Sequence, residues 1–270
     1  LNDTWVWNGE AWSQLHPTSA PPGRTAASVA YDAVTEQIVL FGGINTSGLP
    51  LNDTWTWDGT NWTQQHPTIS PPARAEASMA YDASRQRIVL FGGEIVGSGH
   101  ATPTVNDTWT WDGTNWTQQH PTISPPARTQ ASMAYDASHQ QVLLFGGFGI
   151  SGLANDTWIW DGSVWSELQP AVVPPVRSQA SMVYDAAMKQ VVLFAGAANF
   201  LNGELSDTWL WNGTVWTHYP TQKSPKGLYT VAAYDAMHRV IVAYVVYIAN
   251  KVVSNGGTWL WDGKTWTLHE

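Results

Sequence analysis

The sequence predicts an all-β fold made of repeated four-stranded units, and three observations support this prediction. All 18 Trp residues fall into a Trp-x-Trp-x4-Trp pattern that occurs six times. The first Trp of each set advances by 50, 54, 49, 51 and 50 residues, a period typical of propeller blades. Short apolar or alternating segments separated by turn residues fill each repeat, without helical periodicity. The six sets begin at Trp5, Trp55, Trp109, Trp158, Trp209 and Trp259.

The elements of one repeat can be justified in chain order. The four strands are expected over residues 77–81, 87–91, 107–111 and 115–119. The second strand is apolar and β-branched and ends at Gly92-Gly93, and a variable loop follows it. The third strand alternates with period two and meets Asp112-Gly113, a strong hairpin signal. Pro125-Pro126 cannot lie inside a central strand, so this segment is interpreted as the link to the next unit.

The number of hairpins determines the expected number of blades. Five inner hairpins begin near Ala27, Ala77, Ala131, Ala180 and Val231, against six Trp hairpins, which gives 22 strands. We therefore predict six blade positions, five complete and one partial whose first inner hairpin is absent, within a single domain over residues 1–270. The alternative is five blades with one surplus Trp hairpin. The repeat units span about 1–26, 27–76, 77–130, 131–179, 180–229 and 230–270.

Several motifs at fixed spacing carry a family resemblance. They are the Gly-Gly doublets at 42–43, 92–93 and 146–147, a Tyr-Asp pair before each, the Asn-Asp-Thr-Trp-x-Trp-Asp/Asn-Gly-x-x-Trp signature, and a Pro-Pro-x-Arg link. With these motifs the chain resembles the kelch-repeat β-propellers, above all the bacterial Trp-rich type. The resemblance implies four-stranded blades around a central channel. The later repeats depart from the pattern, with Ala195-Gly196 and Ala243-Tyr244 in place of the doublet and Lys226-Gly227 at the link.

Composition excludes several classes of function. A formal charge of −9 with only 12 basic residues argues against nucleic-acid binding, and no apolar run approaches the roughly 20 residues that span a bilayer. The absence of Cys excludes thiolate metal sites and Cys nucleophiles, and also the activity of the copper oxidase of the kelch family, which needs a Tyr joined to a Cys. Residue 1 is Leu, as expected of a processed product or a fragment. The lack of thiols and the low Lys content favour a secreted or cell-surface location.

The acidic residues and histidines give no catalytic constellation. All 14 Asp occupy repeat positions, where turn formation or backbone contact is the simpler role. His16, His66 and His120 share one repeat position with Gln169 and Tyr219, which does not suit a metal ligand. We therefore expect no catalytic residue, metal or cofactor. An enzyme that converts a small sugar or acid, using Glu76 and an Arg, stays an alternative.

Two sets of residues are candidates for ligand binding. The first is the link Arg set, which suits a carboxylate ligand because a guanidinium group binds carboxylates in a fork geometry. The alternative is that each Arg fastens its own link through the repeated Asp or backbone carbonyls. The set consists of Arg24, Arg74, Arg128 and Arg177.

The second set combines one variable repeat slot with the variable loops. Loops on a rigid scaffold often carry specificity, whereas drift in unconstrained loops is the alternative. The slot holds Ala26, Glu76, Gln130, Gln179 and Tyr229, and the loops add His100, Phe148 and Phe200.

These observations favour a non-enzymatic scaffold that binds a protein or peptide on its loop face. A carbohydrate-binding propeller is the second hypothesis, because aromatic faces bind sugars. However, Trp-x-Trp places both rings on one face of a strand, as blade packing requires. Self-association is a further possibility, since a second copy could cover the incomplete blade.

Overall fold

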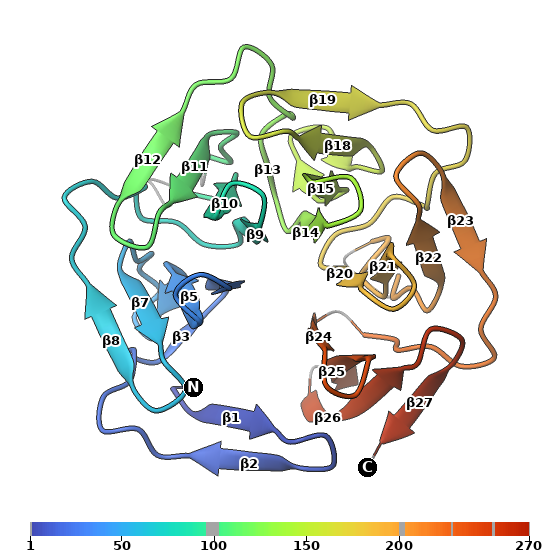
Figure 1. Ribbon diagram of the computed structural model, residues 1–270, viewed down its shortest axis with the longest axis horizontal. Coiled ribbons are helices and arrows are strands. Elements are labelled where there is room, and N and C mark those ends of the chain that lie inside the picture. The colour runs from blue at the N-terminus through green and yellow to red at the C-terminus, as the bar shows by residue number, and fades with distance from the viewer. Residues whose placement is uncertain (1, 96–102, 200–202, 228, 250–251, 270) are drawn as a thin grey trace. The chain divides into compact units, whose positions relative to one another are not determined.

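The computed structural model describes residues 2–95, 103–199, 203–227, 229–249 and 252–269, and every regular element in them is a β-strand. These strands are shown in Figure 1. The chain divides into two compact units, residues 1–122 with 127–129, and residues 123–126 with 130–270. Each unit is described by itself. Within the described residues there is no helix of the length and apolarity that crossing a membrane requires.

The first unit contains a half-blade and two complete blades. The half-blade is β1 (Thr4–Trp7) with β2 (Trp12–Leu15). Blade 1 consists of β4 (Ser28–Asp32), β5 (Gln37–Phe41), β7 (Thr54–Trp57) and β8 (Trp62–Gln65). Blade 2 consists of β9 (Ser78–Asp82), β10 (Arg87–Phe91), β11 (Thr108–Trp111) and β12 (Trp116–Gln119). Three two-residue strands lie in the links and loops: β3 (Arg24–Thr25), β6 (Ile44–Asn45) and β13 (Arg128–Thr129).

The second unit contains three complete blades. Blade 3 consists of β14 (Ser132–Asp136), β15 (Gln141–Phe145), β18 (Thr157–Trp160) and β19 (Trp165–Leu168). Blade 4 consists of β20 (Ser181–Asp185), β21 (Gln190–Phe194), β22 (Thr208–Trp211) and β23 (Trp216–Tyr219). Blade 5 consists of β24 (Tyr229–Asp235), β25 (Val240–Ala249), β26 (Val252–Trp261) and β27 (Trp266–His269). A loop of blade 3 forms the short hairpin of β16 (Phe148–Gly149) and β17 (Gly152–Leu153).

Every complete blade is an antiparallel meander whose strands pair in chain order. This order confirms the predicted four-stranded repeat, and the five complete blades and one half-blade agree with the predicted blade count. The inner strands are five residues long in blades 1 to 4, and the Trp strands are four residues long throughout blades 1 to 4.

The Trp residues form the interfaces between consecutive blades of a unit. In the first unit Trp109, Trp111 and Trp116 of blade 2 pack against Val39 and Phe41 of blade 1. The ring centroids of Phe41 and Trp116 are 5.2 Å apart. The Trp-x-Trp pairs therefore lie on one face of their strand, as predicted.

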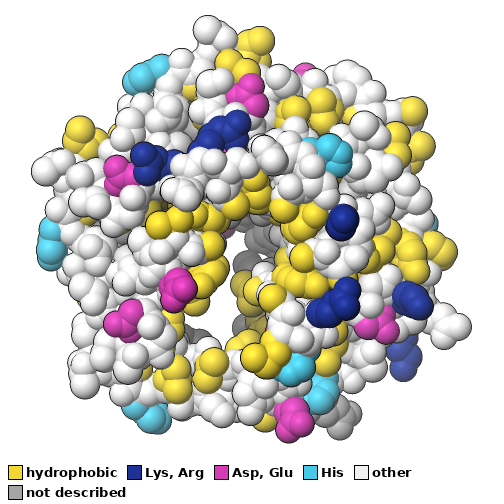
Figure 2. Space-filling view, viewed as in Figure 1, with side chains coloured by type: hydrophobic (Ala, Val, Ile, Leu, Met, Phe, Trp, Pro, Cys, Tyr) yellow, Lys and Arg dark blue, Asp and Glu magenta, His cyan; other side chains and the backbone are white. Residues whose placement is uncertain are grey.

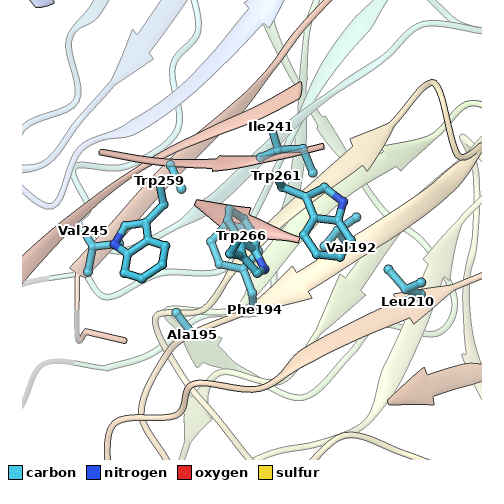
Figure 3. Packing of buried hydrophobic residues seen from close by; sticks show 10 residues of the cluster. Val192, Phe194, Ala195, Leu210, Ile241, Val245, Trp259, Trp261 and Trp266 are labelled. Atoms are coloured by element: carbon cyan, nitrogen blue, oxygen red, sulfur yellow. The ribbon is translucent and has the colours of Figure 1, made fainter. Parts of the chain in front are cut away.

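The same packing recurs in the second unit (Figure 3). Trp259, Trp261 and Trp266 of blade 5 lie against Val192 and Phe194 of blade 4. The phenyl ring of Phe194 is 4.5 Å from the centroid of Trp266. Large buried aromatic area thus replaces the apolar face that a single blade would expose.

The indole N–H groups explain why Asp-Thr precedes each Trp strand. The first Trp of a set donates to the Asp two residues before it, as Trp109 does to Asp107 at 2.7 Å. The third Trp donates to the Thr of the preceding blade, as Trp116 does to Thr54 at 2.9 Å. The motif therefore carries one acceptor for its own blade and one for the next.

The Gly-Gly doublets allow the link of the next blade to approach closely. Gly92 has φ +67°, and a Cβ built on it would lie 2.6 Å from the carbonyl oxygen of Arg128. Blade 4 has Ala195 at the first doublet position with φ 58°. The Arg position of the following link is Gly227, so this link departs from the pattern as well.

The structure corrects the position of the doublet in blade 5. Tyr244 pairs with Thr258, as Phe194 pairs with Thr208 in blade 4. The doublet position is therefore Val245-Val246 rather than Ala243-Tyr244. Without glycines there, β25 continues to Ala249, with a register shift between Val245 and Tyr247.

We predict that Gly92→Ala destabilises the protein more than Gly59→Ala. Gly59 also has a left-handed backbone, φ +94°, but no atom lies within 4 Å of a Cβ added to it. The loss should be about 1 kcal/mol for Gly59→Ala, from backbone strain alone, and about 3 kcal/mol for Gly92→Ala, where overpacking adds to strain. Urea unfolding of both variants measures the difference. Equal losses would contradict the role given to the Arg128 carbonyl.

Candidate functional site

Three link Arg side chains each form a buried ion pair with an Asp of the same blade through two parallel hydrogen bonds. They are Arg24, Arg74 and Arg177. Nη1 and Nη2 of Arg74 donate to Oδ1 and Oδ2 of Asp107 at 2.6 and 2.8 Å. Nη1 also donates to the carbonyl of Gly92 at 3.0 Å, and Nε to that of Pro72 at 3.1 Å. These contacts use four of the five N–H groups of the guanidinium. Arg74 is 1% exposed.

The arrangement repeats with little change in both units. In blade 1 Arg24 pairs with Asp53 at 2.6 and 2.8 Å. In blade 4 Arg177 pairs with Asp207 at 2.8 and 2.7 Å. Arg128 is also buried, at 3% exposure.

The backbone of the same Arg belongs to the contact with the preceding blade. The Arg74 amide donates to the carbonyl of Leu51 at 3.0 Å, and its carbonyl accepts from Gly43 at 2.9 Å. Leu51 and Gly43 flank the loop of blade 1. One residue therefore fastens blade 1 through its backbone and blade 2 through its side chain.

The partner carboxylates are held ionised despite partial burial. Burial raises the pKa of Asp107, but the hydrogen bonds and charge of Arg74, with the indole N–H of Trp109, outweigh it. The net result is a pKa below the usual Asp range, and the same balance of causes lowers the pKa of Asp53 and of Asp207. Each pair is thus a charged structural joint.

This geometry favours the structural interpretation of the Arg set over the ligand interpretation. A buried guanidinium that already binds a carboxylate and two carbonyls offers little to an incoming carboxylate. The link Arg set therefore gives no reason to expect an acidic ligand. The contact between the link and the Gly-Gly loop places both at the same end of a blade.

The variable slot has an unusual backbone. Ala26, Glu76, Gln130 and Gln179 all have left-handed φ values, between 56° and 58°. In the first unit the Glu76 amide donates to the carbonyl of Ala26 at 3.0 Å, and in the second the Gln179 amide donates to that of Gln130 at 3.0 Å. The two slots of each of these pairs are therefore tied together by their backbones. Glu76, Gln130 and Gln179 are half-buried.

The remaining candidates are only partly described. Phe148 is half-buried in β16, and the neighbouring Ile150 is fully exposed at the tip of that hairpin. His100 and Phe200 lie outside the described residues, as does the side chain of Tyr229, whose backbone begins β24.

The Tyr-Asp aspartates have the turn role expected of them. Oδ1 of Asp136 accepts from the amides of Ser138 and His139 at 3.0 and 3.3 Å, and Oδ2 contacts Nδ1 of His139 at 2.8 Å. His238 contacts Asp235 in the same way. Among the described residues no three His, Asp or Glu side chains gather as a metal site would require.

Most Trp side chains are unavailable to a ligand. The first Trp of blades 1 to 5 is at most 8% exposed, whereas Trp5 of the half-blade is 49% exposed. The aromatic surface needed for sugar stacking is thus largely buried in the blade interfaces. On the face seen in Figure 2, charged side chains are interspersed among uncharged ones without a continuous basic area.

Sequence reasoning missed the left-handed slot. The sequence places Ala, Glu and Gln there, and none of these residue types signals a positive φ. One signal in the sequence could have located the slot. Residues 52–74 and 106–128 are identical, and this identity ends just before the slot.

The family comparison agrees with this architecture. The model described as the KLHDC2/KLHL20/DRC7 Kelch-repeats domain matches residues 1–124 and 60–244. No curated protein matches the chain.

We predict that Arg74→Ala costs about 3 kcal/mol or more of unfolding free energy, because Asp107 then keeps a partly buried charge without its partner. The matched control is Arg85→Ala. Arg85 pairs with Asp82 in the same blade, but its side chain is 39% exposed, so the expected loss is below about 1 kcal/mol. Chemical denaturation checks both values, and similar losses would contradict the role given to the buried joint.

We also predict that acid destabilises the protein through these joints. A carboxylate whose pKa is lowered by folding stabilises the folded state above its unfolded pKa of about 3.9, and this contribution is lost as the pH falls below that value. The unfolding free energy should therefore fall between about pH 5 and pH 2. Asp107→Asn, which removes one such group, should make this fall shallower. An unchanged slope would show that Asp107 does not contribute to it.

Proposed function

Because this chain belongs to the Kelch-repeats domain family, we propose that it binds an extended segment of a partner protein through the variable slots beside its links. Kelch-repeat propellers generally mediate protein binding. Each unit carries a tied pair of slots, Ala26 with Glu76 in the first and Gln130 with Gln179 in the second.

The observation that carries this proposal is a left-handed backbone that recurs at four slots while the side chain changes. A left-handed backbone is unfavourable for residues other than Gly, yet all four slots keep it within 2°. Such strain persists only where the surroundings impose it, and it often occurs at binding sites. Here the buried Arg joint precedes each slot by two residues and fixes its position.

The chemistry of the slots supports a peptide ligand. Gln179 carries a half-buried carboxamide, a group that both donates and accepts hydrogen bonds, as peptide groups do. Glu76 brings a carboxylate to its half-buried slot, where a basic or amide-bearing residue of the partner would suit it. A rigid platform with different groups at equivalent positions can distinguish partner sequences.

The other hypotheses lack a comparable observation. The buried Trp rings do not support a sugar platform, and the engaged guanidinium groups do not support the Glu76–Arg enzyme site. Protein binding is therefore the function that the described geometry favours.

We predict that Gln179→Ala weakens binding of peptides selected from a random linear library on the immobilised protein by about tenfold. The loss follows from removing one carboxamide that contacts the peptide. Ala fits this backbone, because Ala26 occupies the equivalent slot with φ 56°. Fluorescence anisotropy with a labelled selected peptide measures the change.

The matched control is Gln86→Ala. Gln86 is also left-handed, with φ 54°, but it lies in the turn at the opposite end of its blade. It should leave peptide affinity unchanged. Equal effects of the two variants, or none from Gln179→Ala and Gln130→Ala together, would refute a binding role for the slots.

A further inference from the structure

One hairpin turn of the second unit contains an Asn-Gly dipeptide. Asn212-Gly213 lies in the turn between β22 and β23 of blade 4, at the position where blades 1, 2, 3 and 5 have Asp-Gly. In an Asn-Gly peptide the amide nitrogen of Gly can attack the side-chain carbonyl of Asn, because Gly has no Cβ that obstructs the approach. The turn therefore holds a nucleophile, an electrophile and a leaving group in two adjacent residues.

Three hydrogen-bond donors hold the side-chain carbonyl of Asn212. Oδ1 accepts from the amides of Thr214 and Val215 and from the hydroxyl of Thr214, each at 3.0 Å. Negative charge develops on this oxygen when a nucleophile adds to Cγ, so the donors are arranged as in an oxyanion hole. Asn212 is exposed, so the amide group that it loses can leave into water.

An imidazole of blade 3 lies directly against Gly213. A Cβ added to Gly213 would lie 2.2 Å from Nε2 and 2.6 Å from Nδ1 of His139, so only a glycine leaves room for the ring. Nδ1 of His139 is bonded to Oδ2 of Asp136 at 2.8 Å. When the carboxylate holds the proton of Nδ1, the neutral ring has its lone pair on Nε2, where it can accept a proton.

The equivalent turn of blade 5 differs in both parts. It has Asp262-Gly263, and an added Cβ at Gly263 would lie 3.5 Å from Sδ of Met188 rather than against an imidazole. Met188 follows Asp185 by three residues, as His139 follows the Asp of its own inner strand. Oδ2 of Asp185 is buried and has no hydrogen-bond partner among the described residues. Blade 5 thus offers a comparison turn without the amide and without the base.

We propose that Asn212 is a self-modification site, converted to Asp or isoaspartate with His139 as the general base. Nε2 of His139 removes the proton of the Gly213 amide, and the amide nitrogen forms a bond to Cγ of Asn212. The bond between Cγ and Nδ2 breaks, and Nδ2 leaves as ammonia with the proton that His139 returns. Water then opens the cyclic imide, at one carbonyl to give Asp and at the other to give isoaspartate.

The Asp product fits this position of the fold. Asp occupies the same position in four other turns, where Asp112, for example, accepts from the amides of Thr114 and Asn115 at 2.8 Å. Conversion to Asp therefore adds a negative charge beside His139 and keeps the bonds of the turn. The turn lies at the end of blade 4 opposite to the slot of Gln179, so the modification is independent of the proposed peptide site.

The test follows Asn212 in the purified, folded chain during incubation at neutral pH. Mass spectrometry of the peptide that contains Asn212, with an assay of the released ammonia, measures the conversion. His139→Ala should slow the conversion about a hundredfold, which is the size of a general-base contribution. Imidazole added to the buffer should restore part of the rate to His139→Ala, which it would not do if the ring only packed against the turn.

Blade 5 supplies a matched gain-of-function control. Asp262→Asn places the same dipeptide beside Met188 and should convert slowly, because no imidazole faces that turn. Adding Met188→His to Asp262→Asn should speed the conversion. The introduced ring can bond to the unpartnered Oδ2 of Asp185 and face Gly263 as His139 faces its own glycine.

Two results would overturn the proposal. The first is a folded chain in which Asn212 stays unmodified and no ammonia is released. The second is a conversion that His139→Ala does not slow and that Met188→His does not speed in the Asp262→Asn chain. That result would make the reaction a property of any Asn-Gly turn rather than of the imidazole beside this one.

Discussion

The buried pair of a link Arg with the Asp before a Trp strand is the interaction on which the rest of each unit depends. Its side chain closes one blade, from the first strand to the third, while its backbone is bonded to the loop of the blade before. The Gly-Gly doublet is the steric consequence, since the Arg carbonyl of the next link leaves no room for a Cβ. Asp-Thr is the polar consequence, since the carboxylate and the hydroxyl receive the two indole N–H groups that the Trp core would otherwise bury without acceptors.

This constraint also decides where binding chemistry can lie. A guanidinium group that already binds a carboxylate within its blade is not available to a ligand. The link Arg residues are therefore poor candidates for ligand recognition. Instead, they fix the position of the link residues that follow them. The slot two residues later has a left-handed backbone, and its residue type differs from repeat to repeat. A repeated structural residue and a variable residue thus lie two positions apart in the chain.

The fifth blade shows how a blade changes when other residues replace the link Arg and the Gly-Gly doublet. The fifth blade has Gly227 in the Arg position and valines at its own doublet, and its β25 and β26 are each ten residues long.

The sequence by itself determined the four-stranded repeat, the shared face of each Trp-x-Trp pair and the turn role of the Tyr-Asp aspartates, because periodicity, turn residues and strand alternation are local properties. It left the Arg set with two interpretations, because an Arg and its Asp are about thirty residues apart in the chain and only folding brings them within hydrogen-bond distance. The left-handed slots were equally hidden, since a positive φ at Ala, Glu or Gln leaves no mark on residue type. Those features depend on which segments pack against one another, and that only the tertiary structure decided.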